Sequence, residues 1–264
     1  GRLAAAKAAP LVAHARRRAT AKTDRETYQA MEGFVHNLNT MHSRAGAQTP
    51  FSSINYGTDT SPEGRMAIRN ILLAEDAGLG HGETPIFPIH IFKVKEGVNY
   101  NPGDPNYDLF ELSCKVSAKR LFPNYVFLDS PFNLQYYKPG HPETEVATMG
   151  CRTRVMGNVY DPERQIAYSR GNLSFTSINL PRLAIESHGD EALFYKKLDD
   201  MLELVAQQLL DRFEIQASKR VYNYPFLMGQ GVWLDSDKLG PNDEVREVLK
   251  HGTLSIGFIG LAET

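Results

Sequence analysis

Apolar residues recur at helical spacing in some stretches of the chain and fill short extended runs in others. Asp24 is expected to cap an amphipathic helix that ends near His42, because apolar side chains then recur every three or four residues. A second helix over residues 61–76 opens with a serine cap and a proline at the first helical position. Further helices are expected over residues 108–121, 190–218 and 242–250.

Strands are expected over residues 51–56, 85–94, 125–129, 155–159, 171–180 and 254–261. The run 85–94 is almost continuously apolar, which suits a strand that is covered on both faces. His90 lies inside this run. We interpret it as a hydrogen-bonded core histidine, with a ligand or substrate contact as the alternative. Strands that alternate with helices predict an α/β fold with a parallel sheet or barrel.

Two of these strands, 51–56 and 171–180, are rich in hydroxyl and amide side chains, and each contains Ser-Ile-Asn. Polar side chains on a strand are costly to bury unless they find hydrogen-bond partners. We therefore expect both strands to line a polar cavity.

Composition is that of an ordinary globular protein, with 264 residues, 42% hydrophobic residues and a net charge of −2. A net charge this close to zero does not indicate binding to nucleic acid or to an acidic membrane. Two cysteines argue against a disulfide scaffold and suit a reducing cytoplasm. No apolar run approaches the roughly 18 residues that span a bilayer. We expect a cytoplasmic protein without nucleic-acid or membrane partners.

Residues 1–23 are alanine-rich and basic, and they contain no acidic residue. This composition resembles an organelle transit peptide, but it also suits a basic helix that docks on another subunit or on an anionic ligand. The sequence begins with glycine and stops just after an apolar run. We therefore favour the helix and expect an internal piece of a longer chain.

The stretch 146–154 reads Val-Ala-Thr-Met-Gly-Cys-Arg-Thr-Arg and lies between two strand-like segments. Gly150 permits a sharp turn, so Cys151 is expected at the tip of a tight loop with Arg152 and Arg154 nearby. Cys151 is a candidate for chemistry, and the alternative is a small buried hydrophobe. Cys114 has apolar neighbours in a predicted helix, and we interpret it as structural.

Several common motifs are missing from the sequence. It has no Gly-x-Gly-x-x-Gly and no P-loop, so neither nucleotide fingerprint is supported. It has no Cys-x-x-Cys and no His-Glu-x-x-His, so we expect no metal site within these residues. A cysteine hydrolase would need a histidine partner, and no motif singles out either His141 or His188.

Five segments kept in order resemble the catalytic subunit of the anaerobic (class III) ribonucleoside-triphosphate reductases: 43–57, 85–94, 149–155, 171–180 and 253–263. The match begins at about residue 24. It implies part of the ten-stranded α/β barrel shared by ribonucleotide reductases and glycyl-radical enzymes. Residues 43–264 would form part of that catalytic barrel, and residues 1–42 a helical region for dimer or effector contacts.

The resemblance implies that Cys151 becomes a thiyl radical and abstracts the 3′ hydrogen of the ribose. It places Met149 beside the radical centre and Asn172 against the substrate hydroxyls. The polar strands supply further candidate substrate contacts, which are Ser52, Ser53, Asn55 and Ser174.

The implied activity is the anaerobic reduction of ribonucleoside triphosphates to deoxyribonucleoside triphosphates for DNA synthesis. The implied partners are the substrate, ATP and deoxynucleotide effectors, a radical-SAM activating enzyme and a second copy in a homodimer. The glycyl radical, a structural zinc site and an ATP-binding domain would lie outside these residues. Formate is the expected reductant, because its users carry the Met149 and Asn172 pair.

Residues 10–42 and 60–76 are the candidate helices for the dimer interface, where the family binds its effector. The basic run that could meet phosphate there is Arg16, Arg17 and Arg18.

Two alternatives to the reductase remain. A glycyl-radical lyase of the pyruvate formate-lyase type needs two adjacent cysteines, but Arg152 follows Cys151. A non-catalytic nucleotide-binding α/β protein would tolerate replacement of Cys151. The 264 residues alone are expected to be inactive and prone to associate, because a partial barrel exposes strand edges and apolar faces.

Overall fold

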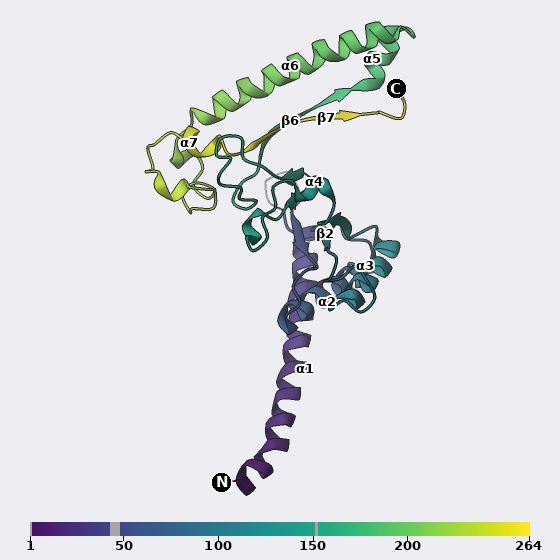
Figure 1. Ribbon diagram of the computed structural model, residues 1–264, viewed down its shortest axis with the longest axis vertical. Helices are drawn as coiled ribbons and strands as arrows, with labels where there is room; N and C mark the ends of the chain where they lie inside the picture. The colour runs from purple at the N-terminus through teal and green to yellow at the C-terminus, as the bar shows by residue number, and fades with distance from the viewer. Residues whose placement is uncertain (1, 43–47, 151–152) are drawn as a thin grey trace. The chain divides into compact units, whose positions relative to one another are not determined.

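The computed structural model describes residues 2–42, 48–150 and 153–264, with side chains from residue 9 onward. The chain forms two compact units (Figure 1). Unit 1 contains residues 1–135 and 148–152, and unit 2 contains residues 136–147 and 153–264. Each unit is described on its own.

Helix α1 (Arg2–Thr40) is the first element of unit 1. Its expected end near His42 is confirmed, but the expected cap at Asp24 is wrong. Alanine, lysine and arginine are strong helix formers, so the helix runs on through residues 2–23 without a break. Asp24 lies inside the helix, where it accepts a hydrogen bond from Asn70 Nδ2 at 2.8 Å.

Unit 1 contains a three-stranded parallel sheet in the order β1 (Ser53–Tyr56), β2 (Ile89–Val94) and β3 (Asn124–Phe127). Helix α2 (Pro62–Ala77) packs between α1 and α3 (Tyr107–Arg120), and the short α4 (Pro131–Leu134) follows β3 (Figure 1). The predicted cap of α2 is confirmed, because Ser61 Oγ accepts a hydrogen bond from Gly64 N at 3.0 Å.

The central strand β2 carries the core of unit 1, as its continuous apolar run predicted. Ile91 and Phe92 are fully buried. The Phe92 ring packs at about 6 Å from the rings of Tyr56, Phe110 and Tyr125. Because β2 has a neighbouring strand on each side, its backbone is also paired along both edges.

His90 on β2 is a core histidine, as expected. It is fully buried, its Nδ1 lies 2.9 Å from the Tyr56 hydroxyl, and its Nε2 lies 3.2 Å from Glu75 Oε2. The angles of the second contact do not satisfy a hydrogen bond, so we treat it as an electrostatic contact. Burial is the main cause that raises the pKa of Tyr56 well above its usual range, and the charge of Glu75 adds to it. This hydroxyl therefore keeps its proton.

Cys114, which we interpreted as structural because of its apolar neighbours, does not lie in the core. Cys114 is exposed on α3 and forms no disulfide. The buried positions of this helix are Leu109, Ser113, Val116 and Arg120. Their spacing of three and four residues defines a stripe toward the core that excludes position 114.

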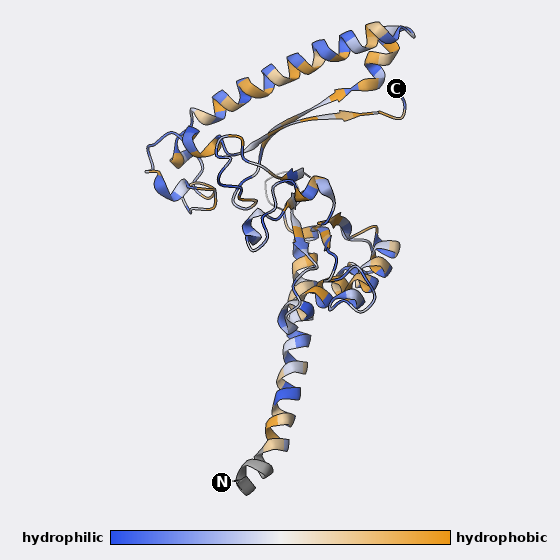
Figure 2. Cartoon of the chain, viewed as in Figure 1, coloured by the Kyte–Doolittle hydropathy of each residue, from blue (hydrophilic) through white to orange (hydrophobic). Residues whose placement is uncertain are grey.

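Unit 2 is built on the parallel pair β6 (Asn172–Asn179) and β7 (Thr253–Ile259). Helix α6 (Glu191–Ala217) packs along this pair and confirms the expected helix 190–218. Figure 2 shows apolar and polar residues alternating around α6. Helix α5 (Leu180–Ser187), which was not predicted, begins directly after β6 with Asn179 as its cap.

The remaining elements are short. Strand β4 covers Ala147–Met149, and β5 covers Thr153–Val155, which ends where the expected strand 155–159 begins. Helix α7 (Arg246–Leu249) starts after Val245 rather than at Asn242, because residues 240–243 form a turn closed by Asp243.

Arg164 forms a two-pronged ion pair with Asp235 and lowers the pKa of that carboxyl to about 2.

Candidate functional site

One face of β1 holds the backbone of residues 148–150. Ser53 and Asn55 are two positions apart and therefore lie on the same face of the strand. Asn55 Nδ2 donates to the carbonyl of Thr148 at 2.7 Å, and Asn55 Oδ1 accepts from the N–H of Thr148 at 3.1 Å. Ser53 Oγ accepts from the N–H of Gly150 at 2.9 Å. These bonds fix the backbone that immediately precedes Cys151.

The polar run 51–56 was expected to line a cavity and contact substrate. The partners that the structure gives Ser52, Ser53 and Asn55 are backbone groups of unit 1, since Ser52 Oγ also donates to the carbonyl of Pro50 at 3.2 Å. Contacts of Ser52, Ser53 and Asn55 with a substrate stay predictions.

Gly150 makes the turn that the sequence predicted. Its φ is +48°, in the left-handed region, and a Cβ added there would lie 2.8 Å from Cε1 of Phe51. Glycine fits this position because it has no Cβ and tolerates positive φ. Met149 precedes it and is half-buried. Cys151 and Arg152 lie outside the described residues.

In unit 2, Asn172 at the start of β6 is held from two sides. Its Nδ2 donates to Thr153 Oγ1 at 3.3 Å, and its Oδ1 accepts from Ser255 Oγ at 2.9 Å. Asn172 remains exposed. Its amide is therefore oriented by neighbours on β5 and β7 and is still accessible from solvent.

Ser174 has a different environment from Asn172. Its Oγ accepts from Arg212 on α6 at 3.0 Å, so it faces the helix layer. The register shifts between Asn172 and Ser174, and a one-residue slip turns neighbouring side chains to opposite faces. The two residues, which an unbroken strand would put on one face, are thereby separated. A substrate contact of Ser174 stays a prediction.

Sequence reasoning did not identify Thr148, Thr153 or Ser255 as partners of the candidate residues. Their roles come from pairings between positions 93, 19 and 83 residues apart. The local sequence offers no signal for such a pairing, because it depends on how separate segments dock.

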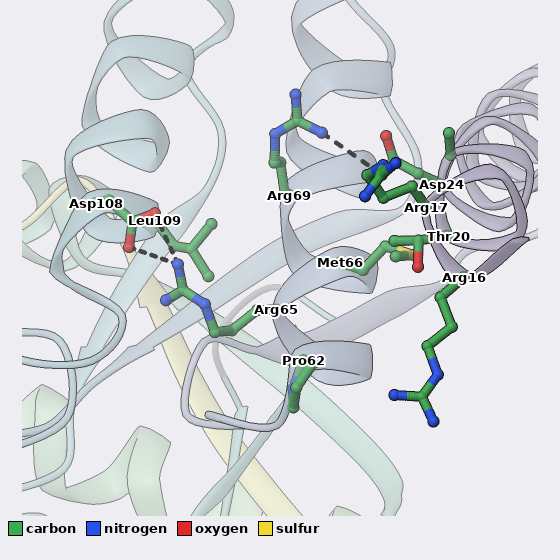
Figure 3. A pocket seen from close by; sticks show the side chains of 11 residues that line it. Arg16, Arg17, Thr20, Asp24, Pro62, Arg65, Met66, Arg69, Asp108 and Leu109 are labelled. Atoms are coloured by element: carbon green, nitrogen blue, oxygen red, sulfur yellow. Dashed lines mark hydrogen bonds and ion pairs between the residues drawn. The ribbon is translucent and has the colours of Figure 1, made fainter. Parts of the chain in front are cut away.

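A second candidate site is a cavity of about 590 Å³ between α1 and α2 (Figure 3). These are the two helices proposed for effector contacts. The lining residues are Arg16, Arg17, Thr20, Ala21, Asp24, Pro62, Arg65, Met66, Arg69, Asp108 and Leu109. Arg16 and Arg17 therefore share one cavity, whereas Arg18 is not among the lining residues.

The charges around this cavity are not balanced. Arg65 pairs with Asp108 at 2.8 Å, and Arg69 with Asp24 at 3.5 Å, as the dashed lines of Figure 3 show. The described part of the chain gives Arg16 and Arg17 no carboxylate partner. Two exposed guanidinium groups thus remain available, which favours an anionic ligand.

Within residues 2–42, 48–150 and 153–264, no three His, Cys, Asp or Glu side chains are grouped to hold a metal ion. None of the helices described there has the length and apolarity to cross a membrane.

Comparison with known proteins gives one family. The family described as "Anaerobic ribonucleoside-triphosphate reductase" matches residues 5–264. The reductase of that name from Escherichia coli (strain K12) is 35% identical over 251 residues, which are 93% of this chain and 34% of that protein. The one from Enterobacteria phage T4 is 32% identical over 259 residues, which are 96% of this chain and 42% of that protein.

Solved structures give the same fold. The anaerobic ribonucleotide reductase from Thermotoga maritima with glycerol in the active site aligns with a TM-score of 0.55 and 15% identity, over 92% of this chain and 38% of that one. The same enzyme in complex with dATP and CTP gives 0.54 and 15%, over 92% and 39%. The expected α/β fold is confirmed as part of the fold of these enzymes. The chain spans about a third of the length of the curated bacterial relatives.

Proposed function

The chain belongs to the anaerobic ribonucleoside-triphosphate reductase family, and we propose that it is part of a catalytic subunit that reduces ribonucleoside triphosphates to 2′-deoxyribonucleoside triphosphates. The observation that carries this proposal is the Met149–Gly150–Cys151 stretch, in which Gly150 is hydrogen-bonded to Ser53 of β1 while Thr148, just before Met149, is hydrogen-bonded to Asn55 of the same strand. Family membership favours the reductase over the lyase and the non-catalytic protein. The subunit works in an anaerobic cytoplasm.

The proposed reaction begins at the thiol of Cys151. As a thiyl radical it takes the hydrogen atom from C3′ of the ribose, so an S–H bond forms while a C3′–H bond breaks. A glycyl radical outside these residues takes the hydrogen atom of the Cys151 thiol and so generates this thiyl radical. The 2′-hydroxyl takes up a proton and leaves as water, and an external reductant, with formate as our proposal, supplies two electrons and a proton and is oxidised to carbon dioxide. The Cys151 thiol then returns its hydrogen atom to C3′, which restores the thiyl radical.

Two uncharged residues, Asn172 and Met149, are proposed to orient and shield the sugar. Asn172, whose amide is oriented by Thr153 and Ser255 and is exposed, suits hydrogen bonds with substrate hydroxyls. Met149 supplies a half-buried, uncharged side chain beside the cysteine in sequence. Radical chemistry depends on excluding water and side reactions, and uncharged neighbours suit that task.

The cavity between α1 and α2 is proposed to bind a nucleotide effector. Arg16 and Arg17 supply two guanidinium groups for its phosphates, and Thr20 adds a hydroxyl. The structure of the Thermotoga maritima enzyme in complex with dATP and CTP supports nucleotide binding in this family. The same helices are proposed to meet a second copy of the subunit in a homodimer.

The full-length subunit tests the function directly. After anaerobic activation by its radical-SAM partner, and with formate present, it should convert ribonucleoside triphosphates to deoxynucleotides. Chromatography of the products measures the conversion. A radical-bearing subunit that forms no deoxynucleotide from any of the four ribonucleotides would refute the proposal.

Charge reversal in the cavity should weaken effector binding. Arg16→Glu and Arg17→Glu each replace an attractive phosphate contact by a repulsive one at an exposed site, so we expect about a fivefold loss of affinity for each, or roughly 1 kcal/mol. Isothermal titration of the full-length subunit with deoxynucleotides measures it. Arg18→Glu makes the same charge change outside the cavity lining and is the matched control. Equal losses in all three variants would contradict the assignment.

Gly150→Ala should slow turnover. The substitution forces an alanine into φ +48° and brings its Cβ against Phe51, so the backbone before Cys151 must shift. We expect about a tenfold loss of kcat in the full-length subunit. Gly80→Ala, where an added Cβ meets no atom within 4 Å, is the matched control.

Adding Phe51→Ala to Gly150→Ala separates the two causes of this effect. It removes the contact with Phe51 but not the backbone strain, so it should restore part of the lost activity. Wild-type turnover by Gly150→Ala would show that the turn does not determine the position of the thiol.

A further inference from the structure

Strand β1 is anchored on one face and along one edge. Ile54 and Tyr56 pack against a buried cluster of Val35, Ile71 and Ala74 from α1 and α2. The strand is also paired with β2 from residue 53 to residue 56. Packing and strand pairing therefore hold β1 in place, and with it the positions of Ser53 and Asn55 on its other face.

Side chains on this face of β1 hydrogen-bond the backbone of residues 148–150, as the backbone of a neighbouring strand would do in a sheet. Asn55 donates to one backbone group of Thr148 and accepts from the other, at 2.7 and 3.1 Å. Two contacts to one residue fix both its position and its rotation. This arrangement needs one donor and one acceptor on the same side chain, which an amide has and a carboxylate lacks. Ser53 adds a third bond at Gly150, 2.9 Å long.

We propose that Asn55 and Ser53 are positioning residues for the radical reaction rather than contacts of the sugar. They set the point from which the chain leaves Gly150, and hence where the thiol of Cys151 stands relative to C3′ of the ribose. The inference rests on the proposed function. Transfer of a hydrogen atom needs near contact, and a shift of about 1 Å in a reacting group can cost on the order of 100-fold in rate.

The test uses Asn55→Asp in the full-length, activated subunit. The aspartate still accepts from the N–H of Thr148 but sets a second acceptor against its carbonyl, 2.7 Å away in the native protein. We expect an unchanged glycyl-radical EPR signal, a KM within about twofold of wild type and a kcat lower by roughly 10- to 100-fold. The isotope effect with 3′-deuterated nucleotide should rise, because hydrogen abstraction becomes the slow step.

Two further variants complete the experiment. Ser53→Ala removes one acceptor without adding repulsion, so kcat should fall less, with the same rise in isotope effect. Asn242→Asp makes the same amide-to-carboxylate change at an exposed loop position and should match wild type.

A raised KM with unchanged kcat would indicate a substrate contact and overturn the proposal, and so would an unchanged isotope effect. Where Asn55→Asp itself lowers the radical signal or the melting temperature, Ser53→Ala decides, and wild-type kcat there overturns the proposal. A wild-type subunit that forms no deoxynucleotide refutes the proposed function instead, and this is seen before any variant is made.

Discussion

Replacing Cys151 by serine in the full-length subunit is expected to leave a normal glycyl-radical signal and to abolish deoxynucleotide formation. Serine keeps the approximate size and polarity of the side chain. Its O–H bond, however, is too strong for a carbon-centred radical to abstract the hydrogen atom and leave an oxygen radical. The radical can then be stored but not passed to the ribose. We expect a loss on the order of 10³-fold or more.

The measurement combines EPR with product analysis on the same anaerobic sample. Cys114→Ser is the matched control, because Cys114 is the other cysteine of the chain and is exposed on α3. It should retain wild-type activity. Turnover by Cys151→Ser would mean that the catalytic assignment is wrong, because no serine can perform the proposed hydrogen abstraction.

The second large effect is expected in the core of unit 1. Glu75→Leu and His90→Leu should each destabilise this unit by about 3 to 5 kcal/mol, because each leaves a fully buried polar group without its partner. Replacing the whole cluster by apolar residues, with Tyr56→Phe added to both changes, should recover most of this loss. No buried polar group of the cluster would then lack a partner.

Hydrogen exchange of the β2 amides, followed by mass spectrometry, measures the free energy of opening within the intact subunit. Asp76→Leu is the matched control, one residue from Glu75 on α2. It breaks an exposed ion pair with Lys119 and should cost less than about 1 kcal/mol. A triple variant as unstable as the sum of its single changes would contradict the view that the cluster acts as one unit.

Much of the local structure could be predicted because its causes are local. The start of α2 is specified locally, because the Ser61 side chain caps the helix and the Pro62 ring suits its first position. The unbroken apolar run around Ile91 and Phe92 required a strand covered on both faces, and β2 is that strand. Gly150 predicted a turn, and the positive φ found there favours glycine.

Other features could not be predicted because their causes lie far along the chain. Asn55 was recognised as part of a strand rich in polar side chains, but its partner Thr148 is 93 residues away. The register shift that separates Asn172 from Ser174 depends on pairing with β7. The start of α1 was misplaced at Asp24 because a good capping residue, taken alone, does not reveal that the helix before it continues.

The sequence by itself determined the alternation of helices and strands, the turn at Gly150, the candidate thiol of Cys151 and the family. These depend on residue type and spacing, which act over a few positions. Only the tertiary structure decided what the polar strand residues hold, which arginines share a cavity and that Cys114 is exposed. The reason is physical. A hydrogen bond or an ion pair forms between atoms within about 3 to 4 Å in space, and folding brings such atoms together from segments that the sequence keeps far apart.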